Sequence, residues 1–248
     1  MRRIAESFVA ARAERRALAE YPGPLPQTLD EAYAIQLEAI GLQGRRVKGW
    51  KVARLPPDIA GKWGAERIAG PVFDLWEADG GEPIVPVFEG GYAAAEAELQ
   101  LQIRTIPECK APELEDAIES IGTVAIGIEA AGSPYAGINA HGPAVTVSDF
   151  GNNAGLVVGP PTTPPFDRKV SSLLNGKLAG EGVAAEPFEA ARFLFDLAAR
   201  YGLPVSPGQW ISAGAITGAH PVAPGDHFEA RFGHELAVAC RFAAEAAR

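Results

Sequence analysis

The sequence predicts an α+β protein in which a helical arm at residues 1–44 precedes a mixed β-sheet body at residues 45–248. Two segments with the apolar spacing of helices fill most of the arm. From Gly49 onward the chain changes to short apolar runs separated by Gly and Pro, which is typical of strand-rich domains. In the body, the segment AAEAELQLQI alternates polar and apolar residues almost perfectly, as a strand does.

Residues 1–20 and 29–43 are expected to form the two helices of the arm. The first is amphipathic, with Ile4, Phe8 and Leu18 on its apolar face against an Ala-rich background. The segment YPGPLPQ ends it and serves as the joint. The second begins at a capping-box spacing, Thr28 to Glu31, and ends near Gly44. The arm therefore has a clear start, joint and end in the sequence.

The body alternates expected strands with two expected helices. Strands are predicted in GWKVARL, GPVFDLW, AAEAELQLQI, TVAIGIEA and GLVVG. Helices are predicted at 112–121 and 187–201, and the pair Asn175-Gly176 predicts a hairpin with a type I′ turn. The order of elements indicates antiparallel or mixed pairing rather than a βαβ repeat.

Composition excludes several classes of protein. The chain has 248 residues, of which 47% are hydrophobic, so a sizeable core is expected. A formal net charge of −9 argues against a nucleic-acid partner. Two cysteines, Cys109 and Cys240, provide neither a disulfide framework nor a zinc–cysteine site. No apolar stretch approaches the roughly 20 residues that span a membrane, and the N-terminus lacks a secretory pattern, so a cytoplasmic location is expected.

Paired carboxylates carry the strongest chemical signal. Glu96 and Glu98 are two residues apart on a predicted strand, so they point the same way and repel each other unless solvent or a cation separates them. Glu129 ends the apolar run VAIGIE, where an unpaired carboxylate is costly. Three carboxylates from two strands would suit Mg²⁺ or Mn²⁺. The alternative is that Glu96 and Glu98 lie on the solvated face of an edge strand.

Lys51 and His141 are further candidates, each with an ordinary alternative. Lys51 lies in the apolar strand GWKVA, where it could bind a substrate carboxylate or act as a buried acid or base with a lowered pKa. A surface lysine that covers apolar groups with its stem is the alternative. His141 lies in the loop NAHGP, where a solvent-exposed histidine is also expected.

Several blocks in the same order resemble the hydratase and decarboxylase branch of the fumarylacetoacetate hydrolase superfamily, and most of all its 2-keto-4-pentenoate hydratases. The resemblance covers roughly residues 44–243. The blocks are GWKVA at 49–53, GPVF at 70–73, EAELQLQI at 96–103, AIGIEAAGS at 125–133, NNAGLVVG at 152–159, and the tail segments at 207–218 and 221–233. The resemblance implies a mixed β-sheet roll of the fumarylacetoacetate hydrolase C-terminal type.

The resemblance also implies roles for individual residues. It implies a divalent metal, Mg²⁺ or Mn²⁺, bound by Glu96, Glu98 and Glu129. It implies that Lys51 is the catalytic residue that faces the substrate. Three further residues would contact the substrate, namely Asn153, Gly214 and Thr217.

The expected activity is a metal-dependent hydratase of aromatic catabolism. It would add water to a small 2-hydroxy-dienoate or 2-oxo-enoate acid, and the protein would be a homo-oligomer. Two alternatives stay open within the superfamily, a 2-oxo acid decarboxylase and a carbon–carbon hydrolase. A non-catalytic binding relative with a degenerate site is the alternative from another class.

The sequence departs from the family pattern at two places near the metal ligands. The acidic residue that usually precedes the second block is missing around Ile68, and Glu66 is out of place for it. The segment Gly132-Ser133-Pro134 stands where the family often has Asp-Ser-Arg, and the family's acidic-Asn pair appears as Asn152-Asn153. These changes leave the expected ligands in place and alter the residues around them, so they bear on the reaction and the substrate rather than on the fold.

Overall fold

The computed structural model describes residues 1–78, 80–109 and 111–244. Its helices are α1 (Arg2–Glu14), α2 (Leu29–Gln43), α3 (Pro57–Trp63), α4 (Leu114–Glu119), α5 (Pro143–Ser148) and α6 (Phe188–Tyr201), with a 3₁₀ turn η1 (Phe150–Asn152). Its strands are β1 (Gly49–Arg54), β2 (Arg67–Val72), β3 (Leu75–Glu77), β4 (Ile84–Val87), β5 (Tyr92–Ile103), β6 (Ile121–Ser133), β7 (Asn153–Thr162), β8 (Lys169–Leu174), β9 (Lys177–Val183), β10 (Trp210–Ser212), β11 (His220–Pro221), β12 (His227–Phe232) and β13 (Leu236–Ala244).

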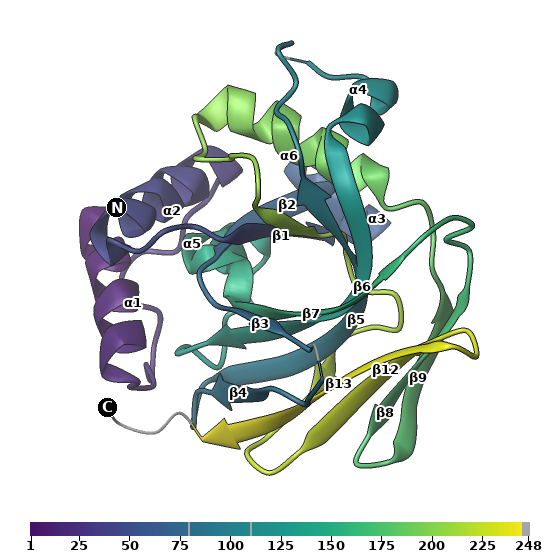
Figure 1. The fold of residues 1–248 in the computed structure, drawn as a ribbon. Helices are drawn as coiled ribbons and strands as arrows, with labels where there is room; N and C mark the ends of the chain where they lie inside the picture. Colours follow the sequence, from purple (N-terminus) through teal and green to yellow (C-terminus); the bar gives the residue numbers. More distant parts are fainter. Residues whose placement is uncertain (79, 110, 245–248) are drawn as a thin grey trace.

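Two mixed sheets form the body, so the predicted α+β class is confirmed. The larger sheet has the order β2-β1-β10-β5-β6-β7-β3, with β11 added beside β5. The smaller sheet has the order β4-β13-β12-β8-β9. In Figure 1 the long strands β5, β6 and β7 curve across the molecule above the smaller sheet, and α6 lies above these strands, on the side away from the smaller sheet. None of the helices in the described ranges is long and apolar enough to cross a membrane.

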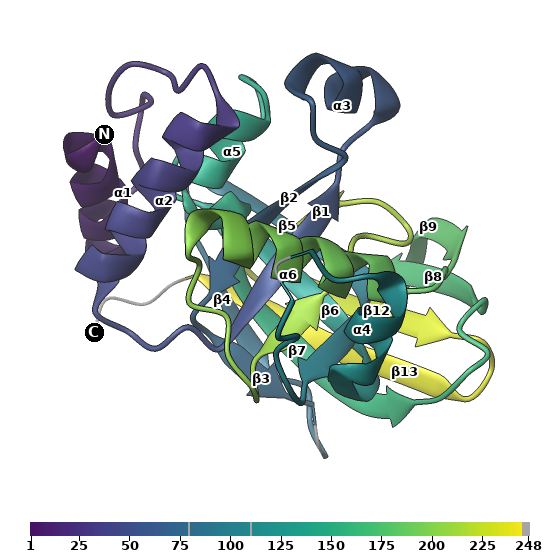
Figure 2. The ribbon, with the colours of Figure 1, turned by 90° about the horizontal axis from the view of Figure 1, so that it is seen from above.

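The helical arm packs directly against the body, as the view from above shows (Figure 2). Phe8 of α1 and Tyr33 of α2 are buried in the same apolar core as the sheet residues. The Tyr33 hydroxyl accepts a hydrogen bond from the Ala69 backbone in β2, at 3.0 Å. Buried Gln36 donates to the carbonyl oxygen of Val147 in α5, at 2.9 Å. The division at residues 44 and 45 stays a prediction, and the two parts share one core.

The first helix ends at Glu14, so the expectation of a helix to residue 20 was wrong. Arg15 takes a left-handed conformation with φ 55° and ends the helix. Leu18 was expected on the apolar face of that helix, but its backbone instead donates to the Pro134 carbonyl oxygen at 2.8 Å. Tertiary pairing with the segment after β6 therefore overrides the local periodicity.

The second helix and the hairpin follow their sequence signals. The Thr28 hydroxyl accepts a hydrogen bond from the Glu31 backbone at 3.1 Å, and Gly44 caps the other end with φ 62°. Asn175 and Gly176 have φ values of 52° and 74°, as a type I′ turn requires. The short helices α3 and α5 show no amphipathic pattern in the sequence. In α5 every residue is buried, so no polar face marks the helix.

Hydrogen bonds from Arg12 of α1 hold the arm against the body. Its guanidinium donates to both carboxylate oxygens of Asp149, at 2.6 and 2.9 Å. It also donates to the carbonyl oxygens of Asn153 and Gly132, each at 3.0 Å. The Asp149 side chain is fully buried and accepts a further hydrogen bond from the Ser133 hydroxyl at 2.6 Å. A buried pair with all its hydrogen bonds made fixes one orientation of α1 on the sheet.

Replacing Arg12 by Ala should lower the free energy of unfolding by about 3–5 kcal/mol, because it leaves the Asp149 carboxylate buried without its counter-charge. Chemical denaturation at neutral pH measures the loss. Arg16→Ala is the matched control, since Arg16 pairs with Glu14 at 3.0 Å on the surface, with both side chains more than half exposed. That control should lose no more than about 1 kcal/mol. Equal losses in the two variants would contradict the anchoring role of Arg12.

Candidate functional site

Three carboxylates meet where β5 pairs with β6. Glu96 on β5 lies directly opposite Glu129 on β6, and Glu98 follows Glu96 on the same face of the strand. Each residue offers one carboxylate oxygen, and these oxygens all lie within 4.8 Å of one another. β5 lies between β10 and β6, so the alternative of a solvated edge strand is wrong.

Burial makes this cluster costly without a cation. Glu98 and Glu129 are each 1% exposed. Burial raises the pKa of Glu98 well above its usual value, and the charges of Glu129 and Glu96 raise it further. Burial also raises the pKa of Glu96, although the positive charge of Lys51 opposes that rise. Glu96 and Glu98 therefore hold protons more tightly than solvated carboxylates do.

The donor set fits a divalent cation. One oxygen of Glu98 accepts a hydrogen bond from the Gly214 backbone at 2.8 Å. Its other oxygen is buried and has no hydrogen-bond partner in the structure. An orphaned carboxylate oxygen beside two further carboxylates is what a hard cation with oxygen ligands requires, and Mg²⁺ and Mn²⁺ are such cations. Glu96, Glu98 and Glu129 would hold it.

Lys51 lies against the same cluster and is 3% exposed, so the alternative of a surface lysine is wrong. Its ammonium nitrogen lies 2.8 Å from a Glu129 oxygen and 2.8 Å from the side-chain oxygen of Asn152. Burial lowers the pKa of Lys51, but the charges of Glu129 and Glu96 outweigh burial and the pKa is raised. Beside these carboxylates Lys51 therefore stays protonated at neutral pH, which is the opposite of the lowered pKa considered from the sequence.

A glycine at position 70 brings Asn152 to Lys51. Gly70 pairs with Lys51 across β1 and β2. A β-carbon on Gly70 would overlap the carbonyl oxygen of Phe150 in η1. The absence of a side chain therefore lets η1 lie against β2, and Asn152 at the end of η1 reaches the lysine.

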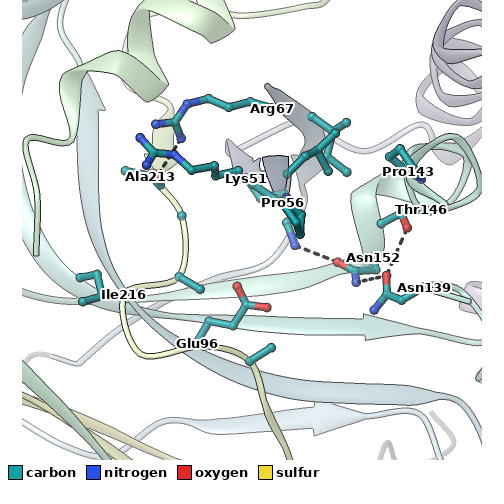
Figure 3. Close-up of a pocket in the computed structure, with 18 of the residues that line it drawn as sticks. Lys51, Pro56, Arg67, Glu96, Asn139, Pro143, Thr146, Asn152, Ala213 and Ile216 are labelled. Carbon is teal, nitrogen blue, oxygen red and sulfur yellow. Dashed lines mark hydrogen bonds between the residues drawn. The ribbon is translucent and has the colours of Figure 1, made fainter. Parts of the chain in front are cut away.

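The site opens into a cavity of about 890 Å³. Lys51 and Glu96 line it, and Asn139 and Asn152 lie together on one side (Figure 3). Tyr92 also lines the cavity, and burial raises the pKa of its hydroxyl. A cavity of this size accommodates a small organic acid beside the carboxylates.

The other expected site residues, Asn153, Gly214 and Thr217, differ in whether they line the cavity. Gly214 lines the cavity. Asn153 is not among the lining residues and donates to a Glu129 oxygen at 3.0 Å, so it orients the carboxylate. The Thr217 hydroxyl lies 2.7 Å from that of Ser172 and 3.1 Å from a ring nitrogen of His220. Its neighbours Ile216 and Gly218 line the cavity. Substrate contacts of Asn153, Gly214 and Thr217 stay predictions.

Sequence reasoning missed Asn139, Tyr92 and Arg67 as lining residues. Asn139 lies two residues before His141, the residue that the loop signal favoured. His141 stacks on the Tyr135 ring at 6.4 Å and its ring nitrogen lies 3.2 Å from the Tyr135 hydroxyl, outside the lining set. The lining residues around Ile68 include no carboxylate, in line with the expected departure from the family pattern, and Glu66 is exposed.

Replacing Glu98 by Gln should remove stabilisation by Mg²⁺ and spare the fold. Wild-type protein should gain about 2.7 kcal/mol at a hundredfold excess of Mg²⁺ over its Kd, and the variant almost nothing. In metal-free wild type, the raised pKa values of Glu96 and Glu98 cause stability to fall as pH rises above about 4.3, the unfolded value. The variant should lose less over that range. Thermal unfolding from pH 4.5 to 8, with and without Mg²⁺, measures both.

Glu235→Gln is the matched control, because Glu235 is exposed in the turn between β12 and β13. It should keep the wild-type response to Mg²⁺ and to pH. An undiminished Mg²⁺ response in Glu98→Gln would remove Glu98 from the ligand set.

Several known proteins resemble this chain in sequence or in fold. No family model matches the chain. The chain is 25% identical to 2-oxo-hept-4-ene-1,7-dioate hydratase of Escherichia coli over 264 residues, which cover 96% of each protein. It resembles 4-oxalocrotonate decarboxylase from Pseudomonas putida G7, complexed with magnesium and adipate, with a TM-score of 0.81 and 23% identity over 96% of this chain and 95% of that one.

A more distant likeness is to fumarylpyruvate hydrolase from Pseudomonas aeruginosa, in complex with Mn²⁺ and pyruvate. The TM-score is 0.55 and the identity 16%, over 81% of this chain and 91% of that one. The hydrolase shares the fold, and the first two proteins match this chain over nearly its whole length. These likenesses support the resemblance of the chain to the hydratase and decarboxylase branch of the fumarylacetoacetate hydrolase superfamily.

Proposed function

We propose that the protein is a divalent-metal-dependent lyase that adds water to a small 2-hydroxy-dienoate or 2-oxo-enoate acid. The observation that carries the proposal is the cluster of Glu96, Glu98 and Glu129 beside Lys51 at a cavity. The similarity to a curated hydratase over 96% of both chains supports the reaction type. A bound divalent cation would supply Lewis-acid polarisation of the C2 oxygen and charge neutralisation for an enolate.

Lys51 supplies the second positive charge at this end of the cavity. Its ammonium group is held by Glu129 and Asn152, so its position is set before a substrate arrives. From there it can donate a hydrogen bond to a substrate carboxylate or to an enolate oxygen. Preorganised donors of this kind stabilise developing negative charge without reorganisation during the reaction.

Proton transfer along the conjugated chain needs a group with a transferable proton beside the substrate. The usual acidic residue is missing near Ile68. Lys51 and the Tyr92 hydroxyl both line the cavity next to Glu96, and each carries a proton at neutral pH. We assign the proton transfer to this pair, with water adding at the remote carbon to give a 4-hydroxy-2-oxo acid.

Decarboxylation is the second candidate reaction, favoured by the structural likeness to a 4-oxalocrotonate decarboxylase. The same charges would stabilise the enolate that remains after loss of carbon dioxide. Carbon–carbon hydrolysis would need a histidine to activate water, and no histidine is among the described residues that line the cavity. A non-catalytic relative would have no reason to keep three costly carboxylates and a lysine together.

The setting of the activity is also proposed by resemblance. We propose a homo-oligomer that acts on a 2-oxo acid in the cytoplasm, in aromatic catabolism. A single sharp species larger than 26.0 kDa in sedimentation would support the oligomer, and a monomer would contradict it.

Replacing Lys51 by Met should lower turnover of 2-hydroxypenta-2,4-dienoate by about 10²–10⁴-fold, because a positioned charge and proton donor is lost. Loss of the dienol absorbance with Mg²⁺ present measures the rate, and NMR of the product separates hydration from decarboxylation. Lys177→Met, at an exposed position beside the hairpin turn, is the control and should keep full activity. Full activity in Lys51→Met would contradict the assigned role.

A further inference from the structure

Two arginines face each other across the strands at one side of the cavity. Arg54 at the end of β1 pairs directly with Arg67 at the start of β2. Both line the cavity. Like charges that lie directly opposite on neighbouring strands destabilise a sheet unless an anion lies between them or solvent surrounds them. Arg54 is exposed, but Arg67 is 9% exposed, so solvent does not account for both.

Arg67 has almost no partner within the protein. Its guanidinium donates one long hydrogen bond, 3.4 Å from the nitrogen to the Ala213 carbonyl oxygen. Among the described residues, no carboxylate oxygen lies within 4.0 Å of either guanidinium, and the nearby Glu189 is paired with Arg192 at 2.7 Å. Burial, and then the charge of Arg54, lower the pKa of Arg67. A buried guanidinium with five donors and one long bond lacks a counter-ion.

Gly214 links this arginine to the carboxylate cluster. Its backbone donates to Glu98 at 2.8 Å. A β-carbon at Gly214 would lie 3.9 Å from a guanidinium nitrogen of Arg67. The acidic cluster and Arg67 thus flank one residue that has no side chain, so a ligand only a few carbons long can reach both. Figure 3 shows Arg67 across the cavity from Asn139 and Asn152.

We propose that Arg67, assisted by Arg54, binds a second carboxylate at the distal end of the substrate, so that this protein acts on 2-oxo dicarboxylic acids. The assignment rests on the proposed function, because it takes the 2-oxo acid end to lie at Glu96, Glu98 and Glu129. A guanidinium binds a carboxylate through two parallel hydrogen bonds, which suits Arg67 better than a point charge would.

The same contact weakens the binding of acids with an apolar tail. Such an acid would cover Arg67 and leave its charge buried and unpaired. A site built for a polar partner discriminates strongly against an analogue that lacks it. Arg67 and Arg54 therefore favour diacids over acids with an apolar tail.

The test compares matched ligands that differ only in the distal carboxylate. Calorimetry with saturating Mg²⁺ gives Kd values for 2-oxoglutarate, 2-oxoadipate and 2-oxopimelate, and for the monoacids of five, six and seven carbons. Wild-type protein should bind at least one diacid about tenfold to a hundredfold more tightly than the monoacid of equal length. The length with the largest ratio reports the distance between the two ends of the site.

Variants assign that preference to the arginines. In Arg67→Gln the ratio of the two Kd values should fall to near one, and in Arg54→Gln it should fall partway. Because each ratio compares two ligands on one variant, a partial loss of folded protein cancels. Arg46→Gln, at an exposed position outside the lining set, should keep the wild-type ratio.

Each failure has its own reading. Wild-type protein that binds pyruvate with Mg²⁺ but shows no diacid preference at any length would overturn the role of Arg67 and leave the proposed function intact. A preference that persists in both Arg67→Gln and Arg54→Gln would also overturn it. Absence of metal-dependent binding of pyruvate and of every other acid would overturn the proposed function and this inference together.

Discussion

Three buried carboxylates repel one another where β5 pairs with β6, and the surrounding contacts of the fold oppose that repulsion. Glu96, Glu98 and Glu129 bring their oxygens within 4.8 Å of one another at exposures of 8%, 1% and 1%. Lys51 offsets part of this charge, and Gly214 donates one hydrogen bond to it. The remaining electrostatic cost is offset by the packing and hydrogen bonds of the fold, and functional sites commonly carry such a cost in stability.

The architecture holds this cluster in three ways. The continuous pairing of β5 with β6 fixes Glu96 opposite Glu129, so the carboxylates cannot separate without breaking the central strands. Asn153 donates a hydrogen bond to Glu129, and Arg12 of the arm donates one to the Asn153 carbonyl oxygen. The arm thus reaches the carboxylate cluster through one intervening residue. Arg12 of α1 also donates a hydrogen bond to the Gly132 carbonyl oxygen. The family pattern often has an arginine in this segment, where the present chain has Gly132-Ser133-Pro134, so here the arginine comes from the arm.

Local patterns predicted the elements and ligands that depend on neighbours in the sequence. Strict alternation placed Glu96 and Glu98 on one face, and the end of an apolar run marked Glu129. Contacts between distant segments were out of reach. Asn152 lines the cavity in place of Asn153 because Gly151, with φ 62°, turns the chain within η1. Leu18 left its helical face for a partner after β6, and Arg67 became informative only once β2 placed it opposite Arg54.

We propose that Glu96, Glu98 and Glu129 together bind one divalent cation. Calorimetric titration with Mg²⁺ and Mn²⁺, with and without oxalate and in two buffers of different ionisation enthalpy, tests it most directly. We expect one ion per chain, tighter binding with oxalate, and loss of binding in Glu96→Ala. Binding should also release protons, because the pKa values of Glu96 and Glu98 are raised. No binding, or binding that survives Glu96→Ala unchanged, would contradict it.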